Sequence, residues 1–135
     1  MSEKPHKKLI VWQKAMAFIE QIYRLTETFP TEERFGLVTQ MRRASVSIAT
    51  NIAEGAARQT AKEMLQFLFI ARGSLSELDT QIEIAHRLDW ISAEQRVSLL
   101  GELDDVSRLL NGLMTSKRAR SDSYSLTHLL PNSLT

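Results

Sequence analysis

Cysteine is absent from the 135 residues, which excludes disulfide bonds, zinc–thiolate sites, iron–sulfur clusters and thiol nucleophiles. Proline and glycine are scarce, at three and five residues, whereas a β-sandwich or barrel of many short strands needs more turn residues. Neither sign of charge dominates: 17 Lys and Arg oppose 16 Asp and Glu, and the net charge of +1 gives no bulk attraction to nucleic acid or membrane. With 43% apolar residues, this composition predicts a helical globular domain.

Long hydrophobic runs are also missing. The longest uninterrupted apolar runs, such as residues 67–71, are far short of the roughly 20 apolar residues that a membrane-spanning helix needs. The opening segment MSEKPHKK is polar and precedes an amphipathic helix without the apolar core of a signal peptide. The sequence therefore predicts a cytoplasmic protein with no membrane partner.

Helical periodicity and turn residues divide the chain into four segments. We expect helices over residues 9–28, 31–58, 60–88 and 92–116. Their short connections favour antiparallel neighbours. The predicted fold is all-α, an antiparallel up-down four-helix bundle over residues 1–116, followed by a weakly ordered C-terminal tail over residues 117–135.

The expected helix starts have capping signals. Thr31 is a candidate N-cap, because two glutamates follow it in the first turn. Thr60 and Ser92 each precede a Glu or Gln by three residues, which is the spacing of a capping box. These signals place the starts of the last three helices.

Each predicted helix has an apolar seam that points to the core. In the first helix the predicted seam is Trp12, Met16, Ile19, Tyr23 and Thr26. The second has Leu37, Met41, Ala44, Ile48 and Ile52. The third has the longest seam, Met64, Leu68, Ala71, Leu75, Leu78, Ile82 and Ala85, and the fourth has Leu99, Leu103, Val106, Leu110 and Leu113.

Two helices carry a further stripe that one core does not need. The first helix has Val11, Phe18, Ile22, Leu25 and Phe29, and the far side of the third has Phe69, Gly73, Ser76, Thr80 and Ile84. One interpretation is a wide core face or scattered surface residues. The other is an oligomer interface, with small residues on the third helix that let another helix approach.

A polar stripe follows one flank of the second helix. Gln40, Ser47, Asn51 and Glu54 form either a structural hydrogen-bond network or a ligand-contact surface.

Four arginines are the candidate nucleic-acid contacts: Arg42, Arg43, Arg58 and Arg72. Of the adjacent pair in this set, we expect Arg42 to face outward. Few aromatic residues stand near these positions in the sequence, so base stacking is not expected.

Catalytic chemistry has few candidates. Glu83-x-x-His86 has the spacing of di-iron bundles, but those need two such motifs and two further inward glutamates. The three histidines are scattered, and the five glycines make no phosphate loop. The sequence therefore predicts no enzyme activity, no metal and no cofactor.

The segment QMRRASVSIATNIAEGAAR, residues 40–58, resembles the signature of the 23S rRNA intervening-sequence protein family, bacterial proteins also called four-helix bundle or S23 ribosomal proteins. The resemblance covers about residues 9–116, and Ala49 replaces the family's usual proline. Further matching pieces are Trp12 with Ala15, Ile22-Tyr23, Phe29-Pro30, Glu33, Phe35-Gly36-Leu37, Phe67-Leu68, Ile70-Ala71-Arg72-Gly73-Ser74 and Glu77-Leu78.

This resemblance implies an antiparallel bundle that assembles into a ring-like homopentamer. The related accessory protein of diversity-generating retroelements binds nucleic acid and a reverse transcriptase, which makes both of them candidate partners here. We therefore expect a non-enzymatic bundle that self-assembles and binds RNA or DNA electrostatically. The alternative is a protein–protein interaction scaffold with no nucleic-acid role.

Overall fold

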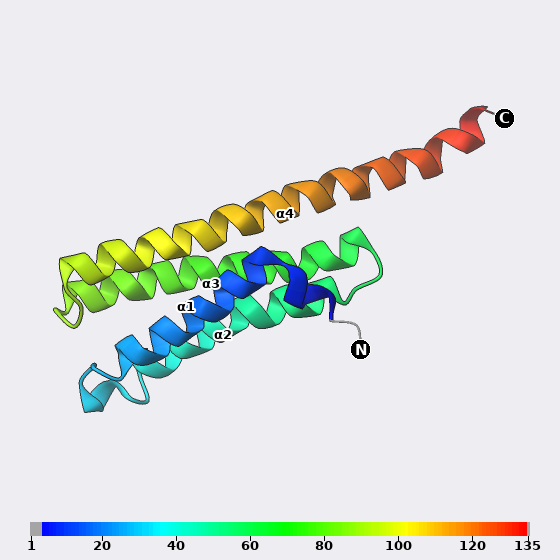
Figure 1. Cartoon of the computed structure of the whole chain (residues 1–135). Coiled ribbons are helices and arrows are strands. Elements are labelled where there is room, and N and C mark those ends of the chain that lie inside the picture. The colour runs from blue at the N-terminus through cyan, green and yellow to red at the C-terminus, as the bar shows by residue number, and fades with distance from the viewer. Residues whose placement is uncertain (1–3, 135) are drawn as a thin grey trace.

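Four α-helices and two short 3-10 helices make up the computed structural model, which describes residues 4–134, with side chains described to residue 122 (Figure 1). The elements are η1 (Pro5–Lys8), α1 (Ile10–Thr26), η2 (Thr31–Glu33), α2 (Leu37–Ala56), α3 (Ala61–Arg87) and α4 (Ala93–Leu134). The predicted all-α fold is confirmed.

The helices form an antiparallel up-down bundle, as predicted. Each helix packs against the next one in the chain, and α1 also packs against α4, with α1 diagonal to α3 and α2 diagonal to α4. The amino terminus and the α2–α3 connection lie at the end of the bundle from which α4 projects (Figure 1). The other two connections lie at the opposite end.

The core consists largely of the predicted seams of α2, α3 and α4. Every residue of the α2 and α3 seams is buried, as are the first four of the α4 seam. At the last α4 position Met114 is buried and Leu113 only packs against the core, one residue away from the prediction.

The predicted face of α1 is only partly right: Thr26 is buried, and Trp12 and Ile19 are partly buried against the core. The core mainly receives the other stripe, and Val11, Phe18 and Ile22 are buried while Met16 and Tyr23 are exposed. Both stripes have helical spacing, so periodicity does not distinguish them. Thr26, a member of the predicted seam, can be buried without losing a partner, because its hydroxyl donates a hydrogen bond of 2.7 Å to the carbonyl of Ile22.

The predicted start of α2 at residue 31 is also wrong. Thr31–Glu33 forms η2, and α2 begins only at Leu37. The interruption is at Gly36, whose φ of −107° and ψ of −114° lie outside the helical region. The predicted caps of α3 and α4 are confirmed. The Glu63 N–H donates to the Thr60 hydroxyl, and Ser92 and Gln95 exchange two hydrogen bonds.

α4 does not end near residue 116 but continues to Leu134. No glycine or proline stands between residues 112 and 131, and Lys, Arg and Ala at 117–120 favour a helix. The segment predicted as a weakly ordered tail is therefore helical up to residue 134. None of the helices, over the described residues, combines the length and hydrophobicity needed to cross a lipid bilayer.

Candidate nucleic-acid interface

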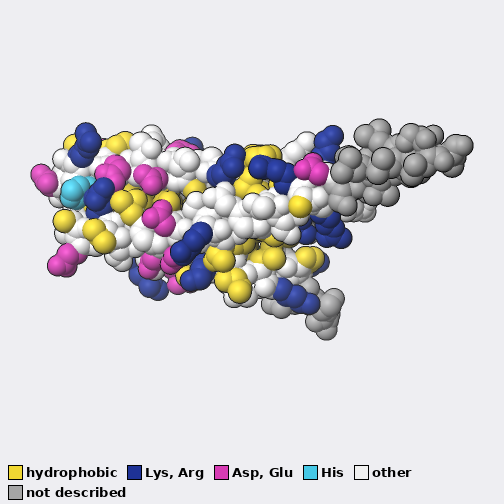
Figure 2. Space-filling view, turned by 90° about the horizontal axis from the view of Figure 1, so that it is seen from above, with side chains coloured by type: hydrophobic (Ala, Val, Ile, Leu, Met, Phe, Trp, Pro, Cys, Tyr) yellow, Lys and Arg dark blue, Asp and Glu magenta, His cyan; other side chains and the backbone are white. Residues whose placement is uncertain are grey.

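Charge is distributed unevenly along the bundle axis. We define the basic end as residues 4–17, 47–73 and 108–122, which the antiparallel topology brings together around the amino terminus, the α2–α3 connection and the projecting part of α4. It contains eleven Lys and Arg and only three Asp and Glu. The opposite half, residues 18–46 and 74–107, contains six Lys and Arg and twelve Asp and Glu. In the view of Figure 2, acidic side chains accordingly gather toward the end opposite the α4 projection.

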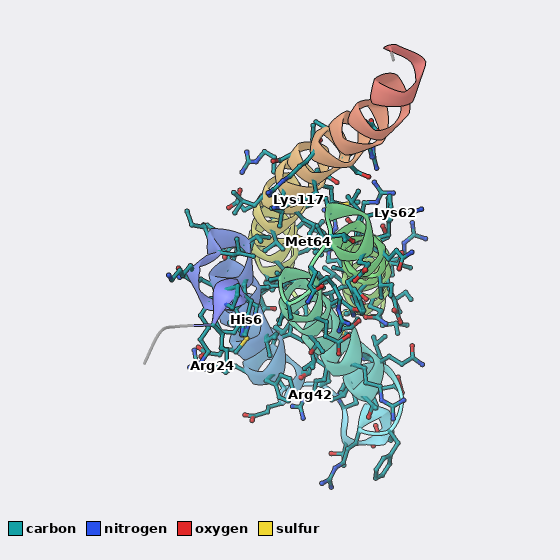
Figure 3. All side chains as sticks on the ribbon, turned by 90° about the vertical axis from the view of Figure 1, so that its right-hand side faces the viewer. His6, Arg24, Arg42, Lys62, Met64 and Lys117 are labelled. Atoms are coloured by element: carbon teal, nitrogen blue, oxygen red, sulfur yellow. The ribbon has the colours of Figure 1, made fainter. Side chains whose placement is uncertain are left out.

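A groove of about 750 Å³ lies at the basic end, between the α2–α3 connection and α4. Arg58 and Lys62 line one side, and Lys117 and Arg120 line the other. Figure 3 looks onto this end and labels Lys62, Lys117 and the buried Met64. The remaining lining residues are Ala56, Gln59, Thr60, Ala61, Glu63 and Ser121. The groove thus presents four cations and one carboxylate.

Arginines at the basic end stack on aromatic rings. The Arg58 guanidinium carbon lies 4.7 Å from the Phe67 ring centroid, and Arg72 and Arg118 lie 5.0 and 5.6 Å from that of Phe69. Such stacking holds a guanidinium plane in place and leaves its N–H edge free to bind phosphate. Phe67 is nine positions from Arg58 in the sequence and Phe69 is 49 positions from Arg118, so these two contacts follow from the fold rather than from neighbouring positions in the sequence.

Arg42 and Arg43 have the opposite placement to the one predicted. Arg42 is half-buried: its Nε donates to the Thr26 hydroxyl at 3.0 Å and its Nη2 to the Tyr23 carbonyl at 3.2 Å, and its guanidinium covers the Tyr23 ring at 4.5 Å. It therefore supports the last turn of α1. Arg43 is the exposed member of the pair.

The polar stripe of α2 is only partly a network. Asn51 Nδ2 donates to the carbonyl and the hydroxyl of Ser47, at 2.9 and 3.1 Å, and the Ser74 hydroxyl of α3 donates to the Ser47 hydroxyl at 2.9 Å. Gln40 and Glu54 are exposed and lie outside these contacts. Ser74 is not among the residues predicted for this network. Its only sequence signal is that it is a polar residue next to the α3 seam.

A second, shallower groove of about 590 Å³ runs along the exposed flank of α2 next to α1. Arg43, Val46 and Asn51 are among its lining residues, together with Tyr23, Thr39, Arg42, Ser47 and Thr50. The α2 flank is therefore accessible in the single chain.

The far side of α3 is exposed over its whole predicted length. Phe69, Gly73, Ser76, Thr80 and Ile84 all face outward, which excludes the wide-core interpretation for this helix. A Cβ added to Gly73 would meet nothing within 4 Å. Arg72 stacks on Phe69, so a residue predicted to contact nucleic acid and one predicted to contact another subunit share one surface.

No metal site emerges among the described residues, which contain no group of three or more His, Cys, Asp or Glu able to hold an ion. Glu83, the acidic member of the di-iron-like spacing, pairs with Arg96 of α4 instead, at 2.7 Å. This hydrogen bond from the guanidinium lowers the pKa of the Glu83 carboxyl. The pair joins α3 to α4.

A family model and a solved structure match this chain. A search of curated proteins finds no match. A crystal structure of a protein of unknown function from the S23 ribosomal protein family of Bacteroides thetaiotaomicron superposes with a TM-score of 0.73 at 25% identity, covering 78% of this chain and 96% of that one. The family model described as 23S rRNA-intervening sequence protein matches residues 7–112. The chain belongs to the 23S rRNA-intervening sequence protein family.

Proposed function

We propose that this chain is a non-enzymatic cytoplasmic protein that assembles into a ring-like homo-oligomer and binds RNA or DNA electrostatically. The observation that carries the proposal is the concentration of eleven Lys and Arg, against three Asp and Glu, at the basic end. Phosphate contacts need a local positive surface, because affinity comes from the release of counterions from the nucleic acid. A net charge of +1 for the whole chain is therefore compatible with binding.

Assembly into a ring would increase the positive potential available to bind nucleic acid. Subunits packed side by side around a ring axis place their basic ends on the same side of the ring. The positive potential of each subunit is then repeated around the axis and adds to that of its neighbours. Five subunits is the number that the family resemblance implies.

The exposed face of α3 supports self-association. Phe69 and Ile84 are each 41% exposed, and small side chains stand between them. Glycine inside a helix costs about 1 kcal/mol relative to alanine. A Cβ at Gly73 meets nothing within 4 Å, so close packing within the chain does not account for this glycine, and the open space leaves room for a second subunit to approach.

Light scattering at micromolar concentration tests the self-association, with Gly73→Leu and Gly101→Leu as a matched pair. Both glycines are exposed in a helix, with open space where a Cβ would be. We expect the wild type and Gly101→Leu to have masses several-fold above the 15.4 kDa of one chain, and Gly73→Leu to shift toward that mass. Circular dichroism should show both variants folded.

Two results contradict this part of the proposal. A wild-type mass of 15.4 kDa across the concentration range excludes the oligomer. Equal masses for the two leucine variants exclude the α3 face as the interface.

The alternative function is a protein–protein interaction scaffold. Large exposed apolar side chains away from the α3 face favour it: Phe35 is 89% exposed, Val97 65% and Ile10 60%. Retention on a heparin column separates the two functions. Retention that decreases as salt rises supports nucleic-acid binding, and passage without retention at low salt supports the scaffold.

A further inference from the structure

The groove at the basic end has cations on both of its sides. Arg58 and Lys62 come from the α2–α3 connection and the first turn of α3, and Lys117 and Arg120 come from α4. These two pairs are more than fifty positions apart in the sequence. A phosphodiester strand lying in the groove is therefore within reach of positive charge from either side.

Arg58 adds a surface for a nucleic-acid base. One face of its guanidinium plane covers the Phe67 ring at 4.7 Å, and its Nε donates to the Glu54 carbonyl at 3.2 Å, so the plane is held from two directions. Unpaired bases stack on arginine planes as they do on aromatic rings. The outer face of Arg58 is exposed and available for such stacking.

The shape of the groove favours one strand over two. Its volume of about 750 Å³ is that of a small-molecule pocket and accommodates a few nucleotides. A duplex presents its phosphates on the outside of a rigid cylinder and keeps its bases stacked inside. A single strand bends into a groove and has bases free to stack.

The geometry points to this groove as a binding site for single-stranded RNA or DNA, with Lys62, Lys117 and Arg120 on the phosphates and Arg58 stacked on a base. This inference rests on the proposed nucleic-acid binding and specifies its site and its ligand. The Glu63 carboxylate also lines the groove and opposes a polyanion.

Fluorescence anisotropy with a labelled single-stranded RNA, and with the same strand in a duplex, tests the assignment on the full-length protein. The groove variant is Lys117→Ala with Arg120→Ala. The control is Arg108→Ala with Arg118→Ala, which removes the same charge from the same helix at positions outside the groove. Glu63→Gln is the third variant.

We expect the single strand to bind more tightly than the duplex. The groove variant should weaken single-strand binding by about tenfold or more, since two phosphate contacts are lost, and the control by about threefold or less. Glu63→Gln should tighten binding.

Three results overturn the inference. One is equal loss in the groove and control variants, and another is a preference for the duplex. In both of these cases the proposed function stands and the groove assignment fails. No binding of either nucleic acid at low salt removes the proposed function and the groove assignment together.

Discussion

Arg42 and Arg43 are neighbours of the same residue type, but they differ in their contribution to the stability of the fold. Arg42 donates hydrogen bonds to Thr26 and to the Tyr23 carbonyl at the end of α1, whereas Arg43 is exposed. We expect Arg42→Ala to destabilise the fold by about 1–2 kcal/mol, because charge-assisted hydrogen bonds to α1 are lost. Arg43→Ala should change stability by no more than about 0.5 kcal/mol. Chemical denaturation of both variants measures the difference, and equal destabilisation contradicts the assignment of Arg42 to the α1 terminus.

Gly55 and Gly73 have opposite surroundings. A Cβ at Gly55 would lie 3.2 Å from the Met64 carbonyl oxygen and 3.3 Å from the Phe67 Cβ, where α2 and α3 approach closely, whereas the space around Gly73 is open. In the dissociated single chain we expect Gly73→Ala to raise the melting temperature, because alanine is favoured over glycine in a helix by about 1 kcal/mol. Gly55→Val should lower it, because the added carbons force the two helices apart.

Thermal melts by circular dichroism check both glycine variants, at a concentration where their oligomeric state is known. A Gly55→Val protein that melts at the wild-type temperature contradicts the close approach of α2 and α3. Hydrogen bonds also join α3 to α2 beside the apolar seam: the Ser74 hydroxyl donates to the Ser47 hydroxyl, which also accepts from Asn51.

At the scale of elements, the Glu83–Arg96 pair connects the ends of α3 and α4. The Arg96 guanidinium donates to both carboxylate oxygens of Glu83, at 2.7–3.1 Å, and this hydrogen bonding lowers the pKa of Glu83. A carboxyl with a lowered pKa in the folded state stabilises the fold above its ordinary pKa, and that contribution is lost as pH falls through the folded value. Arg96→Gln should therefore reduce the melting temperature at neutral pH.

The same substitution should have little effect at a pH below the folded pKa of Glu83, because the carboxyl is then protonated in both proteins. Melting curves of the wild type and Arg96→Gln, collected from neutral to acidic pH, test this convergence. A melting-temperature difference that persists unchanged at low pH shows that Arg96 acts through packing alone.

The seams of α2 and α3 could be predicted from the sequence because one continuous apolar stripe leaves a single way to bury the helix. The buried face of α1 could not be predicted in this way, because its two stripes have the same period. Only packing against the other helices selects between them. The start of α2 depended on the backbone at Gly36, and the end of α4 on the absence of a helix breaker rather than on a positive signal.

At the scale of the whole molecule, the composition shows a nearly neutral chain with a net charge of +1. The separation of charge along the axis follows only from the antiparallel topology, which brings residues 4–17, 47–73 and 108–122 to one end. Likewise, the sequence predicts Arg58 and Arg72 as nucleic-acid contacts but does not predict Lys62, Lys117 and Arg120, which line the groove. Nothing local in the sequence relates α4 to the α2–α3 connection.

The central claim is that binding depends on where the charge lies, and one measurement tests it most directly. Two double variants change the net charge by the same amount: Arg58→Glu with Arg72→Glu at the basic end, and Arg24→Glu with Arg34→Glu at the opposite end. Fluorescence-anisotropy titrations of a labelled structured RNA at low and moderate salt compare both with the wild type. We expect the basic-end variant to lose about tenfold or more in affinity and the other to stay within about threefold, with wild-type binding that weakens steeply as salt rises. Equal losses in the two variants, or no wild-type binding at low salt, would contradict the account.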